Sequence, residues 1–283
     1  MTSTLPAPTT APKPAGKQRS HKTGGLPLLL LLPALFGLAF LIVPLLGLVL
    51  EAPWGNLVTE LSHPSVFEAL KLSVVCATAA TVVCLLLGVP MAWLLARSEI
   101  PGKKGIRSLV TVPMVLPPVV GGVALLIVLG RNGLIGQYLN AWFGISLPFT
   151  TAGVIVAEAF VSMPFLVISV DGALRSADRR YEEAAASLGA SRWLTFRSVT
   201  LPIVAPGIAA GTMLCWARAL GEFGATITFA GNFPGKTQTM PLAVYIALET
   251  DPDAAIVLSL VLLAVSIIVL ASLRDKWINP KTA

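Results

Sequence analysis

The chain has 283 residues, of which 55% are apolar and only 12% are charged, and its net charge is +6. Its mean hydropathy of +0.82 lies well outside the composition of soluble domains. These values exclude a soluble globular protein and predict a membrane protein.

The first 25 residues are rich in Pro, Thr, Ser and Lys and contain no acidic residue. This composition predicts a disordered tail. A cleaved signal peptide would need a shorter apolar region that ends at small residues. The apolar run after Gly25 is long, and only Ala52 offers a small residue near its end. We therefore expect a first helix that is retained.

Six segments are long and apolar enough to cross a membrane as helices, which takes about 20 residues each. Four of them, 26–50, 72–96, 108–130 and 254–273, contain no Asp, Glu, Lys, Arg or His. The other two contain charges: 151–170 holds Glu158, and 202–229 holds Arg218 and Glu222. The prediction is an all-α membrane domain over residues 26–273, followed by a short tail at 274–283.

The positions of Lys and Arg predict the orientation, because these residues accumulate in cytoplasmic loops near helix ends. Sixteen of the twenty cations lie in the two tails and in the loops after the second and fourth predicted spans. With six spans these segments share one side, so both termini are expected in the cytoplasm. The pI of about 9.5 then follows from topology, and we do not interpret it as nucleic-acid binding.

The predicted cytoplasmic loop at about 175–202 begins with a helical pattern. Asp178 is a candidate N-cap, and Glu182 and Glu183 follow in the first turns, where the helix dipole favours carboxylates. Gly189 is suited to end this helix. The segment is too polar to span a membrane.

A second short helix is predicted to follow. Ser191 can cap it, and Trp193, Phe196 and Val199 recur every three residues along one face. Pro202 then lies where a new helix would start. Such a surface either packs against its own bundle or docks a partner.

The spacing of this loop resembles the EAA loop of permease subunits of ABC importers. Glu183-Ala184-Ala185 is followed at the family's spacing by Gly189 and by "VTLP" at 199–202, with Val in place of the family's Ile. The resemblance implies coupling helices that dock on a separate cytoplasmic ATPase subunit. The coupling positions implied are Glu183, Ala184, Ala185, Gly189, Phe196, Leu201 and Pro202.

A second stretch resembles the molybdate permeases within that family. It comprises "GEFGAT" at 221–226, "GN" at 231–232, "PG" at 234–235 and "PL" at 241–242. The segments "LGVPMAWLLARS" at 87–98 and "VPMVLPPVVGGVALL" at 112–126 are also similar, whereas Glu158 departs from the family pattern. The resemblance covers about 65–273 and implies import of molybdate or tungstate; sulfate or thiosulfate stays open.

The same resemblance implies the setting and the partners. It implies a multi-pass protein of a prokaryotic cytoplasmic membrane that works as a homodimer, in contact with lipid. An ABC ATPase subunit and an extracytoplasmic oxyanion-binding protein are the other partners implied. No cofactor is expected, and the two histidines, His21 and His63, lie in the tail and an outer loop, away from any set of catalytic residues.

Two segments within the predicted spans indicate a translocation path. Prolines remove amide donors and glycines remove side-chain bulk, so the third span should kink and expose backbone groups beside a water-filled path or simply pack closely. Arg218 and Glu222 lie four residues apart, so they either form a local ion pair or present the arginine to an oxyanion. The candidate path residues are Pro117, Pro118, Gly121, Gly122, Arg218, Gly221, Glu222 and Gly224.

Ala230 and Gly235-Lys236-Thr237 match the permissive form of a phosphate-binding P-loop. A working P-loop follows a strand, whereas this one follows a membrane helix on the extracytoplasmic side, and Pro234 removes an amide. Asn232, Pro234 and Gly235 therefore predict a turn, and a membrane-bound ATPase is disfavoured. A channel or secondary transporter, the remaining alternative, would need membrane acids in a relay and no docking loop.

The three cysteines, Cys76, Cys84 and Cys215, all fall within predicted spans. We expect them to pack as small residues between helices, with no disulfide framework and no metal cluster.

Overall fold

The computed structural model describes residues 28–278, with side chains described for 30–269 and 271. The disordered tail predicted at 1–25 lies outside the described residues. The chain divides into one unit up to Gly47 and a second unit from Leu48 onward.

Helix α1 (Leu28–Leu50) is apolar along its whole length. No side chain between Leu30 and Leu50 is buried. At about 1.5 Å per residue the helix is long enough to cross the hydrocarbon of a bilayer. The first predicted span is therefore confirmed as a helix of membrane-spanning length and composition.

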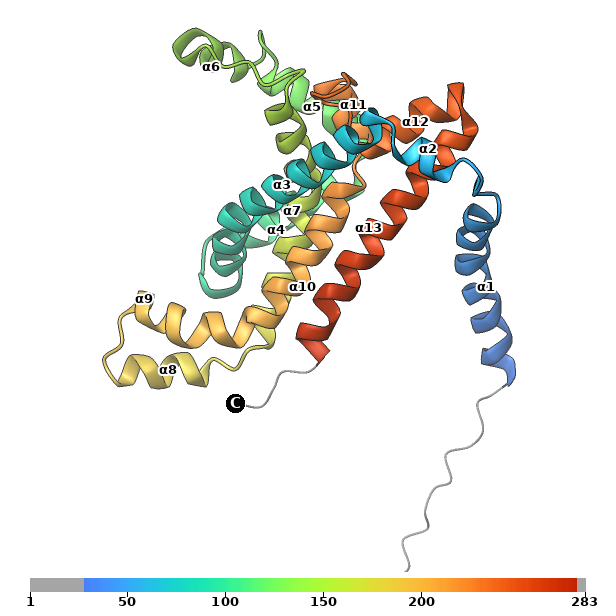
Figure 1. Cartoon of the computed structure of the whole chain (residues 1–283). Helices are drawn as coiled ribbons and strands as arrows, with labels where there is room; N and C mark the ends of the chain where they lie inside the picture. The colour runs from blue at the N-terminus through green and yellow to red at the C-terminus, as the bar shows by residue number, and fades with distance from the viewer. Residues whose placement is uncertain (1–27, 279–283) are drawn as a thin grey trace, which may run out of the picture. The chain divides into compact units, whose positions relative to one another are not determined.

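Three long helices form the core of the second unit: α3 (Pro64–Arg97), α7 (Thr151–Ser176) and α10 (Leu201–Leu220). Helix α7 packs against both of the others, and the three run side by side in Figure 1. A Cβ on Gly207 would overlap the Cβ of Ala173, so α10 approaches α7 where only glycine fits. Small residues at such contacts are what allows helices to pack closely in lipid.

The predicted packing role of the cysteines is confirmed. All three are buried and unpaired in disulfides. Cys84 and Cys215 lie in the core between α3, α7 and α10, and the Cys84 thiol is 3.5 Å from the carbonyl oxygen of Ala159. Cys76 belongs to a smaller cluster with Val154.

The C-terminal helices cover one side of this core. Helix α13 (Pro252–Ile278) packs against α12 (Met240–Thr250), α10 and the short α2 (Leu57–Leu61), and α12 also contacts α3. The amide of Met240 donates to the Ser73 hydroxyl at 2.7 Å, which fixes the start of α12 on α3. Helix α13 continues to Ile278, past the start of the tail predicted at 274–283.

The predicted span at 108–130 is broken into two helices. The chain bends by 115° between helices α4 (Lys103–Val115) and α5 (Pro118–Leu129). The kink was predicted, and its cause lies in the sequence: Pro117 and Pro118 lack amide donors, and Leu116 before them is extended, with φ −65° and ψ 135°.

The prediction of one continuous helix over 202–229 is wrong. Helix α10 ends at Leu220, and after a break of three residues α11 (Gly224–Ala230) begins. Helix α11 packs against α5 and α7. Glu158, the residue that departs from the family pattern, lies in the interior of α7, which is one continuous helix over Thr151–Ser176.

Within the part of the chain that the structure describes, five helices have the length and composition to cross a membrane, and the number is six if the bent pair of α4 and α5 is counted as one span. All regular elements in residues 28–278 are helical. The predicted class, an all-α membrane protein, is therefore confirmed, and the predicted six spans correspond to the five helices together with the bent pair of α4 and α5 counted as one span.

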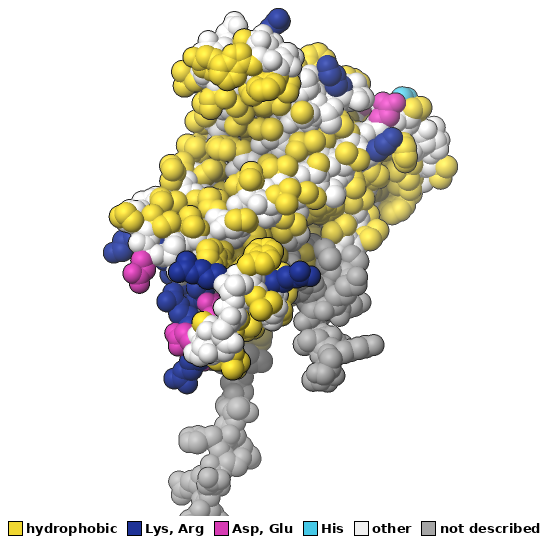
Figure 2. Space-filling model, turned by 90° about the vertical axis from the view of Figure 1, so that its left-hand side faces the viewer, with side chains coloured by type: hydrophobic (Ala, Val, Ile, Leu, Met, Phe, Trp, Pro, Cys, Tyr) yellow, Lys and Arg dark blue, Asp and Glu magenta, His cyan; other side chains and the backbone are white. Residues whose placement is uncertain are grey.

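The two ends of the second unit differ. Helices α8 (Arg180–Ser187) and α9 (Arg192–Thr195) lie at one end, and α5, α6 (Gly136–Phe143), α11 and α12 lie at the other (Figure 1). On the face shown in Figure 2, charged side chains gather mainly at the α8–α9 end, below a broad apolar surface.

Candidate functional site

The turn between α8 and α9 is built on Gly189. Its φ of +84° lies in the left-handed region that favours glycine. The Gly189 amide donates to the carbonyl of Ala186 at 3.0 Å, and the Ala190 amide donates to that of Ala185 at 3.0 Å. These two bonds form a Schellman motif, so the predicted helix end at Gly189 is confirmed.

The start of α8 lies one residue beyond the position that an Asp178 N-cap implies. Arg179 occupies the cap position, and the Asp178 carboxylate instead accepts a hydrogen bond from the Arg180 amide at 3.0 Å. Asp178 thus still satisfies a free amide of the first turn.

The second helix of the loop is not separate from the fifth span. Ser191 caps α9 as predicted, accepting the Leu194 amide at 3.2 Å. The chain is then helical without interruption from Arg192 to Leu220, through a π-helical turn η1 (Phe196–Thr200). Pro202 lies in the first turn of α10 as predicted, but the chain does not turn there. The loop and the span therefore form one continuous rod.

Aromatic residues join this rod to α3. The Phe196 ring lies 5.8 Å from that of Trp193 and 6.1 Å from that of Trp93 on α3. Beside them, the end of α3 and the α8–α9 hairpin, which comprises residues 180–200, line a groove of about 660 Å³.

The outer surface of the α8–α9 hairpin is apolar and exposed. Leu188 is 89% exposed and Trp193 is 69% exposed, and Tyr181 and Leu194 are also exposed. Of the predicted coupling residues, Glu183, Ala184, Gly189 and Pro202 are exposed, whereas Ala185, Phe196 and Leu201 are half-buried.

Glu182 is the polar centre of the hairpin, and the sequence singled out its neighbour Glu183 instead. Glu182 Oε1 accepts hydrogen bonds from Arg97 Nε at 3.1 Å, Arg97 Nη2 at 2.9 Å and Thr200 Oγ1 at 3.0 Å. Only 8% of the Arg97 side chain is exposed. The sequence offered one signal for this pair: Arg97 and Glu182 carry opposite charges and lie in two loops that were predicted on the same side of the membrane.

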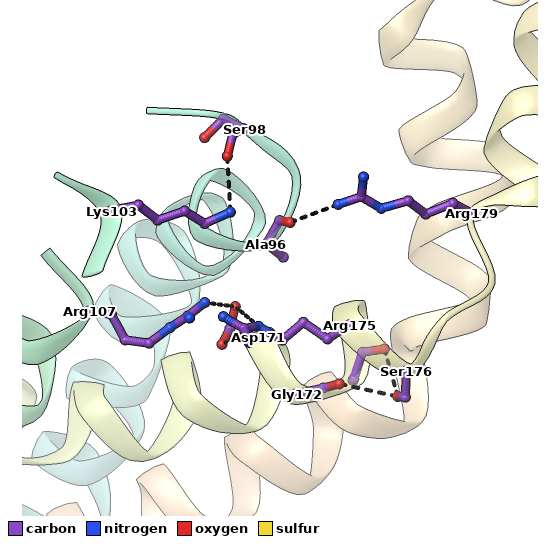
Figure 3. Close-up of polar contacts among 10 residues, drawn as sticks. Ala96, Ser98, Lys103, Arg107, Asp171, Gly172, Arg175, Ser176 and Arg179 are labelled. Atoms are coloured by element: carbon purple, nitrogen blue, oxygen red, sulfur yellow. Dashed lines mark hydrogen bonds and ion pairs between the residues drawn. The ribbon is translucent and has the colours of Figure 1, made fainter. Parts of the chain in front are cut away.

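Further ionic contacts bind the helices at this end (Figure 3). Asp171 of α7 pairs with Arg107 of α4 at 2.9 Å and with Arg175 at 3.2 Å. The Arg179 guanidinium donates to the Ala96 carbonyl at 3.3 Å, next to the end of α3. These contacts therefore tie α4 to α7, and α3 to the residue that precedes α8.

At the opposite end, the two broken helices meet through predicted path residues. A Cβ on Gly122 of α5 would lie 2.6 Å from Thr228 Cβ, and a Cβ on Gly224 of α11 would lie 2.8 Å from Pro118 Cβ. Gly121 instead faces Phe160 of α7. Pro117 and Gly221 are exposed and lie outside these contacts. Close packing therefore accounts for Gly122 and Gly224.

The ion pair, one of the two alternatives that the sequence left open for Arg218 and Glu222, joins the last turn of α10 to the break before α11. Arg218 Nη1 lies 2.6 Å from Glu222 Oε2, and Glu222 Oε1 accepts the Ala225 amide at 2.8 Å. Glu222 is 1% exposed. Glu158, on α7, is equally buried, and its Oε2 has no hydrogen-bond partner.

The apparent P-loop forms a closed turn. The amides of Lys236, Thr237 and Gln238 all donate to the carbonyl oxygen of Phe233, at 3.1, 2.9 and 3.0 Å. The Thr237 hydroxyl is buried and accepts the Phe233 amide. The groups that would hold a phosphate are thus used within the turn, and the predicted turn is confirmed.

The helical fold, its broken spans and the exposed α8–α9 hairpin define a membrane-embedded transport component. The chain belongs to the family described as the binding-protein-dependent transport system inner membrane component, whose model matches residues 85–283. It is therefore a transport subunit and not an enzyme.

Two individual relatives are similar to this chain over most of its length. The molybdenum transport system permease protein ModB of Mycobacterium tuberculosis is 49% identical over 249 residues, which cover 88% of this chain and 94% of the relative. The sulfate transport system permease protein CysT of Escherichia coli is 37% identical, over 85% of this chain and 88% of the relative.

A solved structure shares the fold. The crystal structure of a bacterial ABC transporter for the acidic polysaccharide alginate contains a chain that superposes with a TM-score of 0.74, at 18% identity, over 90% of this chain and 96% of that chain.

Proposed function

We propose that this chain is the permease subunit of an ATP-driven importer that carries molybdate, or the similar tungstate, into a prokaryotic cell. The observation that carries the proposal is the identity to a molybdenum transport permease, which exceeds the identity to a sulfate permease over a similar length. The string "GEFGAT" at 221–226, which covers the break between α10 and α11 and the first residues of α11, is a further resemblance to molybdate permeases.

The α8–α9 end faces the cytoplasm in this proposal, and so do both chain termini. The support is the distribution of Lys and Arg, which favours the cytoplasmic side for the loops that hold Arg97 to Arg107 and Arg175 to Arg197.

The α8–α9 hairpin docks on a separate ABC ATPase subunit. Its support is the exposed apolar surface around Leu188 and Trp193, which a membrane protein gains nothing by leaving uncovered at a charged, aqueous end. Because the hairpin continues into α10, a movement of the docked ATPase would displace the whole rod. The residues assigned to coupling are Glu183, Ala184, Ala185, Gly189, Phe196, Leu201 and Pro202.

The opposite end meets an extracytoplasmic binding protein, and two copies of the chain enclose the path. The alginate importer was solved with a periplasmic protein bound. Broken helices at membrane depth are tolerated beside protein or water, which favours α5 and α11 as the lining of the path. The residues assigned to the path are Pro117, Pro118, Gly121, Gly122, Arg218, Gly221, Glu222 and Gly224. Gly122 and Gly224 contribute to it by letting α5 and α11 pack closely, and Arg218 and Glu222 contribute as an ion pair.

The test is anion-stimulated ATP hydrolysis by the complete complex in lipid vesicles, with its binding protein loaded in turn with molybdate, tungstate, sulfate or thiosulfate. Stimulation by molybdate or tungstate is expected. Stimulation by sulfate or thiosulfate alone would overturn the substrate class. Uptake without any ATPase subunit would instead favour a secondary transporter or channel.

A further inference from the structure

The geometry points to Glu182 as a positioning residue that fastens the α8–α9 hairpin to α3. Because of this contact, α3 moves together with α7 and α10 when the hairpin moves. This inference rests on the proposed coupling function, but it concerns a contact inside the permease and not the surface that meets the ATPase.

Chain connectivity explains why such a contact is needed. Helix α7 leads into α8 through only three residues, and η1 continues directly into α10. Both helices are therefore tied to the hairpin by the backbone. Helix α3, the third member of the core, ends at Arg97 and has no such covalent tie. Any force that reaches α3 from the hairpin must pass through side-chain contacts.

One carboxylate oxygen provides that link. Glu182 Oε1 receives both Arg97 donors at 2.9 and 3.1 Å and the Thr200 hydroxyl at 3.0 Å. A residue of α8 therefore joins the last residue of α3 to the last residue of η1. Charge-assisted hydrogen bonds of this length are stronger than neutral ones, and the low exposure of Arg97 limits screening by water.

Neighbouring contacts support the same joint. The Arg179 guanidinium reaches the Ala96 carbonyl at 3.3 Å, so a second α3 group is held from the start of α8. The Phe196 ring, on η1, packs against Trp93, which is also on α3. Both contacts lack opposite charges, so the pair of Glu182 and Arg97 is the one ionic tie between hairpin and α3 in the described residues.

The adjacent acid has a different environment. Glu183 is exposed and forms no ion pair within residues 30–269. The two consecutive glutamates therefore have different roles. Glu183 is exposed and contacts the ATPase, whereas Glu182 binds Arg97 and joins the hairpin to α3. Their isosteric glutamine variants provide a matched comparison.

The experiment uses the complete importer in lipid vesicles and measures anion imported per ATP hydrolysed. For Glu182→Gln and for Arg97→Gln we expect a fall of about fivefold or more in this ratio, the range of a typical coupling energy, with ATP hydrolysis largely kept. The double variant should be no worse than either single variant, since both remove the same interaction. Additive losses, or an unchanged ratio in Glu182→Gln, would overturn the inference.

A second measurement does not depend on the transported anion. Spin labels at Glu99, just after α3, and at Tyr181, on α8, are introduced after the three buried cysteines are replaced by alanine. In the permease bound to its ATPase, we expect a narrow distribution of distances between the two labels, both with and without ATP. The distribution should broaden in Glu182→Gln but not in Glu183→Gln. A narrow distribution in Glu182→Gln would also overturn the inference.

The two measurements distinguish failure of the proposed function from failure of the role assigned to Glu182. If the wild-type complex imports none of the tested anions, the proposed function fails, while the label separation still decides the role of Glu182. If Glu182→Gln does not accumulate in the membrane, Thr200→Val removes one donor to the same oxygen and should produce a smaller broadening; no change in that variant counts against the joint.

Discussion

The Glu222 carboxylate lies 2.6 Å from the Arg218 guanidinium and also accepts the Ala225 amide at the start of α11. With 1% of Glu222 exposed, its charge is compensated within the same chain from two directions. The positive charge of Arg218 is therefore already used. In this conformation the pair acts as a joint between α10 and α11 and leaves no free cation for an oxyanion.

Removal of Arg218 tests this interpretation. Arg218→Ala leaves a buried carboxylate without its counter-charge, which typically costs about 3–5 kcal/mol of stability. We expect a clear fall in the thermal unfolding temperature of the purified permease, and the added change Glu222→Gln should restore most of it. An Arg218→Ala variant that melts like the wild type but has lost uptake would instead indicate direct contact with the anion.

A second prediction concerns the contact between α5 and α11. Gly122→Ala places a Cβ 2.6 Å from Thr228 Cβ and 2.9 Å from the Ala225 carbonyl oxygen, so the two helices must separate. Overpacking of this kind costs about 1–3 kcal/mol. We expect lower thermal stability and slower uptake.

The control for that prediction is Gly172→Ala on α7. Gly172 is also helical, but a Cβ there meets nothing within 4 Å. The control should be as stable as the wild type or slightly more stable, because alanine favours helix over glycine. Equal stability of the Gly122 and Gly172 variants would contradict the close contact.

The spans could be predicted from sequence because hydrocarbon thickness imposes a length that composition reveals directly. The kink at Pro117 and Pro118 and the turn at Gly189 were also predictable, since missing amides and a left-handed backbone are local requirements. The end of α10 at Leu220 was not, because the residues from Ala219 to Thr226 contain no proline and could continue a helix. The break is stabilised by the buried Glu222 carboxylate, a tertiary contact.

The same distinction separates Glu182 from Glu183. The spacing of the EAA motif identifies Glu183, because the motif is a pattern of positions along the docking surface. The partner of Glu182 is Arg97, 85 residues away in sequence, and only the packing of α3 beside the hairpin brings them together. Pairwise contacts of this kind are absent from the local pattern of a single sequence.

The third prediction concerns the hairpin turn. Gly189→Ala forces a residue with a Cβ to φ +84°, which costs about 1–2 kcal/mol, although no neighbouring atom obstructs the new methyl group. We expect weaker co-purification of the ATPase subunit from detergent extracts.

Gly189→Asn provides the comparison, because asparagine tolerates the left-handed region better than alanine. It should retain more of the ATPase subunit than Gly189→Ala. The reverse order would mean that the backbone conformation of the turn is not what the ATPase requires.

The last prediction concerns Lys236 in the apparent P-loop. A phosphate-binding loop must leave successive amides free for the anion. Here the amides of Lys236, Thr237 and Gln238 converge on one carbonyl oxygen, that of Phe233. Lys236→Ala should therefore leave ATP hydrolysis by the complete complex at the wild-type rate, whereas replacement of the P-loop lysine in the ATPase subunit itself should abolish it. Loss of hydrolysis in Lys236→Ala would mean that this turn opens to bind nucleotide, against its hydrogen-bonding pattern.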